Sequence, residues 1–271
     1  MRGINTRFIN DLLVGELSYF LSQVKNNRDT LSLEIRNGYI NIYYKGGNLL
    51  KITQQTKGYS FYFDSKYCKH ANPTGKESLI RLLTKNEAEE YITNFDLFKR
   101  EMDLWFKDHP KEERDYQHKL LVNNPCIVDI EYQIKRIMRL DMLVVADRKL
   151  IIVENKYGNG AISGNAGVSK HYADMCDVLN TPELYKELVE SVCCISKCKK
   201  ALGLADDSYD EMYFDSAEIL FLFANYNADS KRISNEIKSI TKTIEAKQLM
   251  MKKDEYLLDL SRAKDMFAYE N

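Results

Sequence analysis

The segment from Arg139 to Lys156 constrains the fold most, because two apolar runs in it are bounded by charged residues where more apolar ones would be expected. The two runs are typical of strands that fold back on each other as a hairpin around Asp147 and Arg148. With a two-residue turn at this point, Ala146 faces Lys149 and every other pair of the hairpin follows from that register.

Three charged side chains meet at the open end of this hairpin. Counting outward pair by pair brings Asp141 opposite Glu154, with about 5 Å between their Cβ atoms. Lys156, two residues beyond Glu154, shares their face. Two carboxylates and an ammonium group are costly to desolvate in a buried hairpin unless they bind something such as a divalent cation. The pattern therefore predicts an active site.

Two other interpretations of the hairpin stay open. Asp141 and Lys156 could form a structural ion pair that needs no ligand. A three-residue turn would shift the register by one residue and move Asp141 to the other face. The Glu-x-Lys triplet alone is uninformative, since it recurs at Glu236–Lys238 and Glu245–Lys247 in a stretch of helical period.

Composition indicates a globular protein. The chain has 271 residues, 44% of them hydrophobic and 29% charged, which suits one large or two modest domains. It has no run of about 18 apolar residues and no signal-peptide pattern, so we expect a cytoplasmic location. A net charge of −1 argues against coating of nucleic acid by bulk electrostatics, although local basic clusters could hold phosphates. Those clusters are Lys66, Lys69 and Lys76; Arg136 and Arg139; and Lys197, Lys199 and Lys200.

The six cysteines do not indicate a zinc module. They lack the paired spacing of zinc ligands, and only one of them has a histidine nearby, at His70. We expect reduced thiols at Cys68, Cys126, Cys176, Cys193, Cys194 and Cys198.

Residues 1–75 are expected to form a small module of one helix and a β-meander. An amphipathic helix is predicted from Thr6 to Lys25. Four short strands follow, separated by glycine-containing turn signals. They are predicted at Leu31–Arg36, Tyr39–Tyr44, Asn48–Thr53 and Tyr59–Phe63, with Tyr43, Tyr44 and Lys45 as core residues or as contacts for a nucleic-acid chain.

Residues 76–228 are expected to form the main domain. A helical pattern to about residue 122, broken at Asp108–Pro110, precedes a strand at Cys126–Ile134 and the hairpin described above. A glycine-rich link then enters a long helical stretch that reaches Leu202, and an apolar strand follows at Glu218–Phe223. The order of helix, three strands, helix and strand predicts an α/β (α+β) fold with a mixed sheet flanked by helices.

Residues 229–271 are expected to be a C-terminal helical extension. Apolar residues recur in a heptad-like stripe. The stripe would pack on the chain's own core or form the seam of a homodimer. Its members are Ile233, Ile237, Ile240, Ile244 and Met251.

The charged hairpin and this order of elements resemble the PD-(D/E)XK nuclease superfamily, whose core follows the same order. Asp141 on the second strand and Glu154–Lys156 on the third match its motif, and the resemblance covers roughly residues 85–225. The wider string from Asp129 to Asp174 is similar to a group of bacterial nuclease-like proteins in this superfamily. A restriction-endonuclease-like core is the fold that the resemblance implies.

The resemblance also implies roles for individual residues. Asp141 and Glu154 would hold Mg²⁺ (or Mn²⁺) with the main-chain carbonyl of Asn155, and Lys156 would orient the attacking water. Many members add a glutamate from the first helix, for which Glu113 is our candidate and Glu112 the next. Magnesium held by one or two carboxylates suits phosphodiester cleavage on independent chemical grounds.

Residues around the motif are expected to contact substrate or support the site. Tyr157, Lys170 and His171 are the predicted substrate contacts, and the first amides of the helix after the glycine-rich link could face a phosphate. Asp129 and Glu131 share a strand face and either buttress the site or pair with Arg136 or Arg139.

Two residues depart from the family pattern. Leu140 stands where the superfamily name has proline. Asn155 replaces the usual apolar residue and needs a hydrogen-bond partner if it is buried.

Together these features predict a metal-dependent nuclease that acts on nucleic acid, DNA in preference to RNA, in bacterial defence or repair. The alternative is a non-catalytic module that binds nucleic acid or protein and keeps the nuclease fold. A third interpretation is a structural partner assembled through the stripe from Ile233 to Met251.

Overall fold

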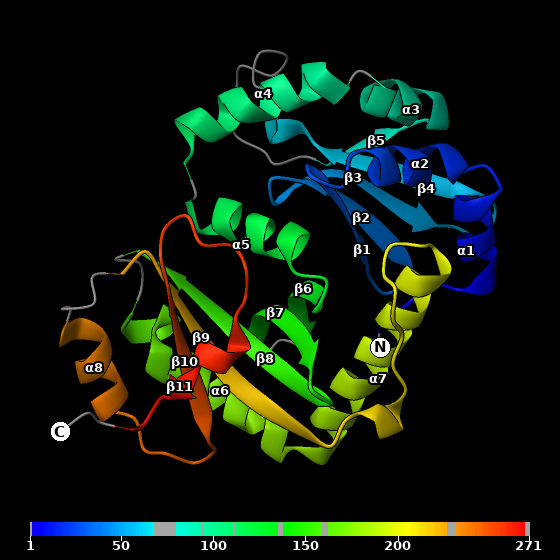
Figure 1. Cartoon of the computed structure of the whole chain (residues 1–271). Helices are drawn as coiled ribbons and strands as arrows, with labels where there is room; N and C mark the ends of the chain where they lie inside the picture. Colours follow the sequence, from blue (N-terminus) through cyan, green and yellow to red (C-terminus); the bar gives the residue numbers. More distant parts are fainter. Residues whose placement is uncertain are drawn as a thin grey trace. The chain divides into compact units, whose positions relative to one another are not determined.

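The computed structural model describes residues 2–67, 80–93, 95–110, 112–134, 138–158, 162–226 and 231–268. Within these ranges the chain is a mixed α and β protein with two sheets and eight α-helices (Figure 1), as expected for its fold class. It divides into two compact units, Met1–His118 with Cys194–Ser208, and Lys119–Cys193 with Tyr209–Asn271. None of the helices in these ranges is long and apolar enough to span a membrane.

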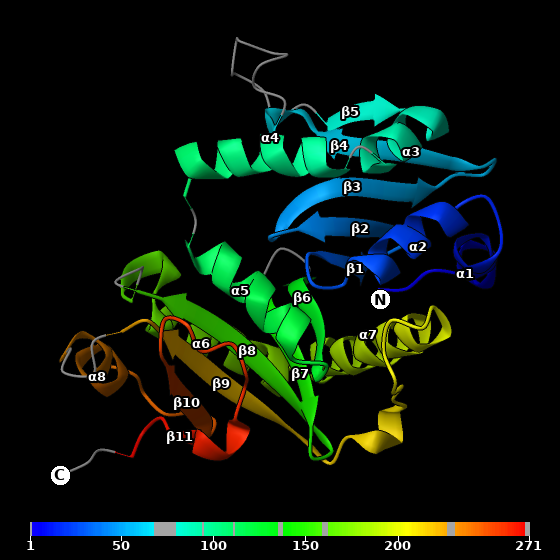
Figure 2. The same cartoon turned by 45° about the horizontal axis from the view of Figure 1, so that its top comes forward.

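The first unit is built on a five-stranded antiparallel sheet in the order β1-β2-β3-β4-β5, which Figure 2 shows. Its strands are β1 (Leu31–Ile35), β2 (Tyr39–Tyr44), β3 (Gly47–Gln54), β4 (Tyr59–Asp64) and β5 (Ile80–Leu83). Its helices are α1 (Thr6–Leu13), α2 (Ser18–Asn26), α3 (Lys85–Thr93), α4 (Phe95–Asp108) and the start of α5 (Glu112–Asn123).

Alternate residues of β4 join this sheet to three helices. Side chains two residues apart point to the same face of a strand, so one apolar face of β4 can meet α1, α2 and α3 in turn. The ring pairs are Phe8 with Tyr59, Phe20 with Phe61, and Tyr91 with Phe63, with centroids 4.8, 5.5 and 4.9 Å apart. The core of the first unit therefore lies between this face and these helices.

The predicted meander is confirmed, but two features near it differ from expectation. The helix expected from Thr6 to Lys25 is two helices, because the chain turns between Leu13 and Ser18. At Gly15 a Cβ atom would lie 2.5 Å from Asp11 Oδ1, so this turn requires glycine. Residues 80–83, expected to be helical, form β5, because they pair with β4, a long-range contact that has no local signal. The domain boundary expected near residue 75 lies outside the described residues.

The second unit is built on a six-stranded sheet in the order β11-β10-β9-β8-β7-β6. Strand β7 runs antiparallel to β6 and β8, whereas β9 and β10 run parallel to β8. Helix α6 packs against β9 and runs behind the sheet in the view of Figure 1. The strands are β6 (Ile127–Ile134), β7 (Met138–Ala146), β8 (Lys149–Tyr157), β9 (Ser216–Ala224), β10 (Ala246–Met251) and β11 (Lys264–Asp265), and the helices are α6 (Val168–Asn180), α7 (Pro182–Ala201, shared with the first unit) and α8 (Lys231–Lys238).

The hairpin of β7 and β8 has the predicted register. Ala146 pairs with Lys149, and the pairing continues to Met142 with Val153. The turn residues Asp147 and Arg148 have φ of 47° and 60°, as a two-residue type I′ turn requires. The three-residue alternative, which would have moved Asp141 to the other face, is therefore wrong.

The predicted helical stripe at the C-terminus is also wrong. Helix α8 ends at Lys238, and the chain then forms β10, which pairs in parallel with β9 from Ala246–Ile219 to Met251–Ala224. Four β-branched residues lie between α8 and β10 and lower the helix propensity there, while the open edge of β9 offers hydrogen bonds to a strand. A homodimer seam along one helix from Ile233 to Met251 therefore has no structural basis, and this segment completes the second sheet.

Burial of His118 makes the stability of the first unit depend on pH. His118 is 4% exposed, and its burial lowers the pKa of its imidazole to about 4, with the nearby charges of Lys45 and Arg114 acting in the same direction. An unfolded histidine has a pKa of about 6.5, so the unfolded chain binds this proton first as the pH falls.

We expect His118→Gln to remove this dependence. From about pH 6.5 down to about pH 4, the wild type should lose about 3 kcal/mol of unfolding free energy more than the variant. Urea titrations of both proteins at several pH values measure the difference. Parallel losses in the two proteins would show that His118 is protonated as easily in the folded state as in the unfolded one.

Candidate active site

Glu154 is the centre of the candidate site. It lies near the end of β8 and is only 2% exposed. Its Oε1 atom accepts a hydrogen bond from Lys156 Nζ at 2.8 Å and lies against Nδ1 of His171 on α6. Its other oxygen, Oε2, has no hydrogen-bond partner within the described residues. A buried carboxylate oxygen without a partner is costly, which indicates a place for a cation or a water molecule.

Lys156 connects Glu154 to the loop that begins α6. Its side chain is 7% exposed, and Nζ donates to the carbonyl oxygen of Ala166 at 2.7 Å as well as to Glu154. The loop must be compact to offer this carbonyl, and at Gly167 a Cβ atom would lie 2.6 Å from the main chain of Ser163. The glycine-rich link therefore places α6, and His171 one turn inside it, beside the end of β8.

The register of the hairpin is consistent with the face predicted for Asp141. It precedes Leu143 by two residues, and Leu143 pairs with Ile152, which precedes Glu154 by two, so regular alternation gives Asp141 and Glu154 the same face. Asp141 Oδ2 accepts the main-chain N–H of Asn155 at 2.9 Å, and Asn155 lies two residues beyond Val153, the last paired residue of β8. Convergence of the two carboxylates to within about 6 Å, as expected for neighbouring strands, stays a prediction.

The ion pair of the hairpin was expected between Asp141 and Lys156, but in the structure Lys156 pairs with Glu154. Lys156 pairs with Glu154 on its own strand, where two residues of separation place both side chains on one face. On the neighbouring strand, Phe221 and Phe223 stand beside Glu154 and Lys156 in the parallel register and are fully buried. These rings exclude water from one side of the pair, so its attraction acts in a medium of low dielectric constant.

Asn155 lies between the two charged residues and faces the other side of β8. It is 1% exposed, and neither its Oδ1 nor its Nδ2 atom has a hydrogen-bond partner among the described residues. The partner that a buried amide requires is thus missing from the described residues.

The donor set fits a magnesium ion in part. Among the described residues no group of three or more His, Cys, Asp or Glu side chains could hold a metal ion. Magnesium keeps several waters and is usually bound through one or two carboxylates, so Asp141 and Glu154 satisfy its minimum requirement. The unpartnered Oε2 atom of Glu154 is the observation that favours such an ion.

The other predicted site residues have different positions. Tyr157 is the last residue of β8 and is half-buried. Lys170 is exposed and pairs with Asp174 one helical turn later. Glu113, with Glu112 before it, lies in the first turn of α5, and the metal-site role expected for it stays a prediction.

Two amides at the start of α6 are engaged locally. The N–H groups of Gly167 and Val168 donate to the carbonyls of Gly164 and Ile162. A phosphate facing the N–H groups of Ser169 and Lys170 stays a prediction.

Neither predicted buttress is shown to contact the site. Asp129 is fully buried and accepts the N–H of Ile130, whereas Glu131 pairs with Arg139 at 3.5 Å on the surface. Arg136, the other expected partner, lies outside the described residues, as do Lys69, Lys76, His70 and Cys68.

Two contributors to the site were missed in the sequence. The Ala166 carbonyl has no signal of its own, because main-chain position depends on the path of the loop. Phe221 and Phe223 did have a sequence signal, because their alternation in an all-apolar strand predicts that they share a face.

Replacement of Asn155 by leucine tests whether its amide has a partner. Asn155→Leu should leave the free energy of unfolding unchanged or raise it by about 1 kcal/mol, because an apolar group of similar size replaces two unpartnered buried polar atoms. Urea titrations of the variant and of the wild type measure this change. A loss above about 1 kcal/mol would instead show that the amide is hydrogen-bonded, for example to an ordered water.

Comparisons with known proteins do not add to this geometry. No family model, no curated protein and no solved structure matches the chain. The fold and the site described above are therefore the observations on which a function can be based.

Proposed function

We propose that the second unit is a metal-dependent nuclease of the PD-(D/E)XK type that hydrolyses phosphodiester bonds of nucleic acid, with DNA preferred to RNA. The observation that carries the proposal is Glu154, which is buried, bonded through one oxygen to Lys156 with His171 Nδ1 beside that oxygen, and without a partner at the other oxygen among the described residues. Such a carboxylate is arranged to bind a cation on its open side.

The topology of the second unit supports the same proposal. Helix α5 is followed by β6, β7 and β8, then by α6 and α7, and then by β9, which is the order that the superfamily core has. The motif residues occupy the second and third strands of this series, as the resemblance requires. A restriction-endonuclease-like core is therefore the finer fold that we propose.

Each residue of the site would then have a defined task. Asp141 and Glu154 would hold Mg²⁺ or Mn²⁺, together with the main-chain carbonyl of Asn155. When bound, such an ion activates water and neutralises charge on the phosphate. Lys156 would hold a positive charge beside the reacting phosphate, and His171 would orient Glu154 by contact with Oε1.

A non-catalytic role for this fold is favoured by one observation. The ammonium group of Lys156 already has two close acceptors, Glu154 Oε1 and the Ala166 carbonyl, and these suffice for a structural ion pair that fixes the loop before α6. In that alternative the unit binds nucleic acid or protein without cleaving it. The two experiments below separate these functions.

Metal binding is tested with Asp141→Asn. An amide oxygen can still accept the Asn155 N–H, so the fold should be kept, while loss of one carboxylate charge should abolish cleavage and weaken the binding of magnesium. Calorimetric titration with Mg²⁺ and Mn²⁺, beside assays on plasmid, linear and single-stranded DNA, measures both effects. Asp147→Asn in the exposed turn of the same hairpin is the matched control. Equal magnesium binding by all three proteins would place the metal elsewhere or exclude it.

Lys156→Ala separates the enzyme from the structural ion pair. In both cases Glu154 loses a buried counter-charge, so the metal-free variant should lose about 3 kcal/mol or more of stability. In the enzyme, added Mg²⁺ should replace that charge and restore the melting temperature, while cleavage stays about two to three decades below the wild type.

Lys149→Ala is the control for this experiment. Lys149 pairs with Glu218 at the other end of β8 and is partly exposed, so its loss should cost about 1 kcal/mol or less and leave cleavage intact. If magnesium does not restore Lys156→Ala and the wild type cleaves none of the substrates, the non-catalytic function is the correct one.

A further inference from the structure

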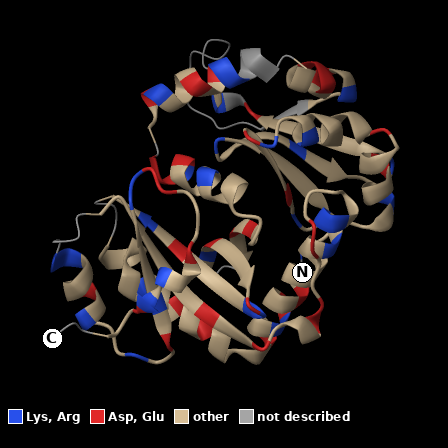
Figure 3. Ribbon diagram, in the orientation of Figure 1, with Lys and Arg blue, Asp and Glu red and all other residues tan. Residues whose placement is uncertain are grey.

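Helix α4 of the first unit carries a basic hollow. The hollow has a volume of about 500 Å³ and is lined by Tyr44 at the end of β2 and by one face of α4. Figure 3 shows basic segments alternating with acidic ones along this helix. Its lining residues, which we call the α4 hollow, are Tyr44, Lys99, Arg100, Asp103, Leu104 and Lys107.

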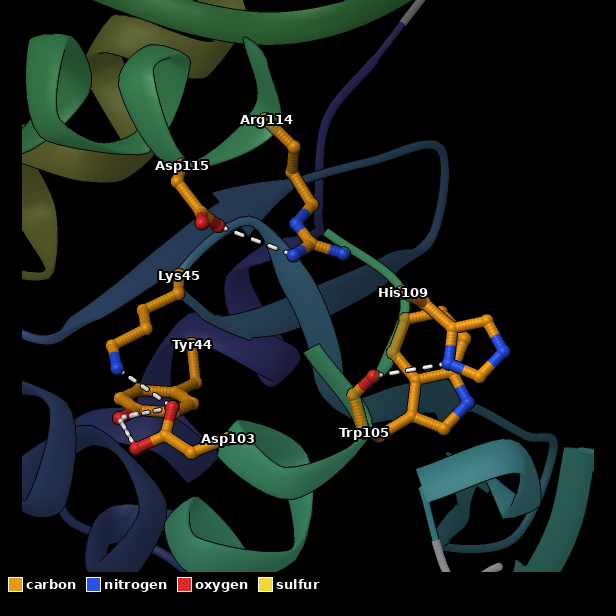
Figure 4. Close-up of polar contacts among 7 residues, drawn as sticks. All are labelled: Tyr44, Lys45, Asp103, Trp105, His109, Arg114 and Asp115. Carbon is orange, nitrogen blue, oxygen red and sulfur yellow. Dashed lines mark hydrogen bonds and ion pairs between the residues drawn. The ribbon is translucent and has the colours of Figure 1, made fainter. Parts of the chain in front are cut away.

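The one carboxylate among these lining residues is already neutralised. Asp103 accepts the Tyr44 hydroxyl at 3.1 Å and pairs with Lys45 Nζ at 2.6 Å, as Figure 4 shows. Despite partial burial, which would lower it, the pKa of Lys45 is raised by its hydrogen bonds to Asp103 and Tyr44. Asp103 therefore pairs with Lys45, and within the described residues it forms no ion pair with Arg100 or Lys107.

Cations gather around a single ring in this hollow. Lys45 Nζ and Lys99 Nζ lie 5.1 and 5.4 Å from the centroid of the Tyr44 ring. Arg100 and Lys107 are exposed on the same face of α4, and within the described part of the chain neither side chain forms an ion pair or a hydrogen bond. Like charges placed this close repel each other, and a bound anion would relieve the repulsion.

The spacing of these cations matches a chain of phosphates better than a single anion. Seven residues separate Arg100 from Lys107, which is about 10 Å along a helix. In duplex DNA successive phosphates of one strand are about 3.4 Å apart along the axis, so this row spans about three of them. Leu104, which is 44% exposed, and the Tyr44 ring provide apolar surface between the charges.

We propose that the α4 hollow binds the phosphodiester backbone of nucleic acid. All of its lining residues belong to the first unit, and such binding needs no metal ion. We choose nucleic acid over other polyanions because of the proposed function. The arrangement of charges in the hollow is observed independently of that function. Net charge is no obstacle, because the charge of −1 is a sum over the chain and the hollow concentrates cations locally.

The test is the salt dependence of binding to a labelled single-stranded oligonucleotide in EDTA, where metal-dependent cleavage cannot occur. The double variant Arg100→Ala/Lys107→Ala should bind about ten-fold more weakly at low salt. The slope of log K against log salt should fall by about 1.4, or about 0.7 for each phosphate that the variant no longer neutralises. Alanine favours helix, so the melting temperature should stay close to that of the wild type.

Arg7→Ala/Lys57→Ala is the matched control, since both residues are exposed in the first unit, lie outside the α4 hollow and give the same change of charge. Unchanged affinity in this control, with weaker binding in the α4 variant, supports the site. Equal weakening in both, weakening in neither, or no binding by the wild type overturns it. Competition by poly-glutamate as strong as that by unlabelled oligonucleotide would overturn the choice of nucleic acid.

The outcome is independent of the nuclease proposal. Asp141→Asn should bind the oligonucleotide in EDTA as the wild type does, because its carboxylate is not part of the α4 hollow. If no nucleic acid is cleaved but the α4 variant still shows the smaller salt dependence, the α4 hollow is supported and the nuclease is not. If nucleic acid is cleaved but the α4 variant binds as the wild type does, the nuclease is supported and the α4 hollow is not.

Discussion

The ammonium group of Lys156 is the interaction on which the second unit depends. A cation with a 7% exposed side chain is tolerated only if its charge and its protons are satisfied, and Glu154 and the Ala166 carbonyl provide this. Because Ala166 precedes α6, the same ammonium group fixes where that helix begins. His171 then reaches Glu154 from α6, so one buried charge determines both the strand end and the helix that covers it.

Local patterns predicted much of this arrangement. The register of the β7–β8 hairpin follows from a two-residue turn, and Arg148, unusual at positive φ, is stabilised there by a two-bond contact with Asp215 at 2.8 and 2.9 Å. Alternation along β8 then places Glu154 and Lys156 on one face without further information. The meander of the first unit was predictable for the same reason, since glycines at positive φ mark its turns, as at Gly38 and Gly58.

The elements that the sequence did not predict are strands formed by long-range pairing with other strands. The segment from Ile240 to Met251 has an apolar spacing that suits a helix, yet β9 offers an open edge and the segment becomes β10. Similarly, β5 exists because β4 lies next to it. The partner of Lys156 also needed the fold, because Asp141 and Glu154 are equally placed by sequence and only the structure assigns the ammonium group to Glu154.

Two consecutive residues near the end of β8 carry buried polar atoms without a partner in the described part of the chain. Among the described residues, Glu154 keeps one buried oxygen without a partner and Asn155 keeps two such atoms, although an apolar residue at position 155 would remove that cost. Isolated surface positions could carry such defects cheaply, but these are 2% and 1% exposed and lie in consecutive residues of a central strand. Proteins retain uncompensated polar groups in a core mainly where a site needs them. The stability given up at Glu154 and Asn155 is therefore the physical reason to look for the activity of this protein at the end of β8.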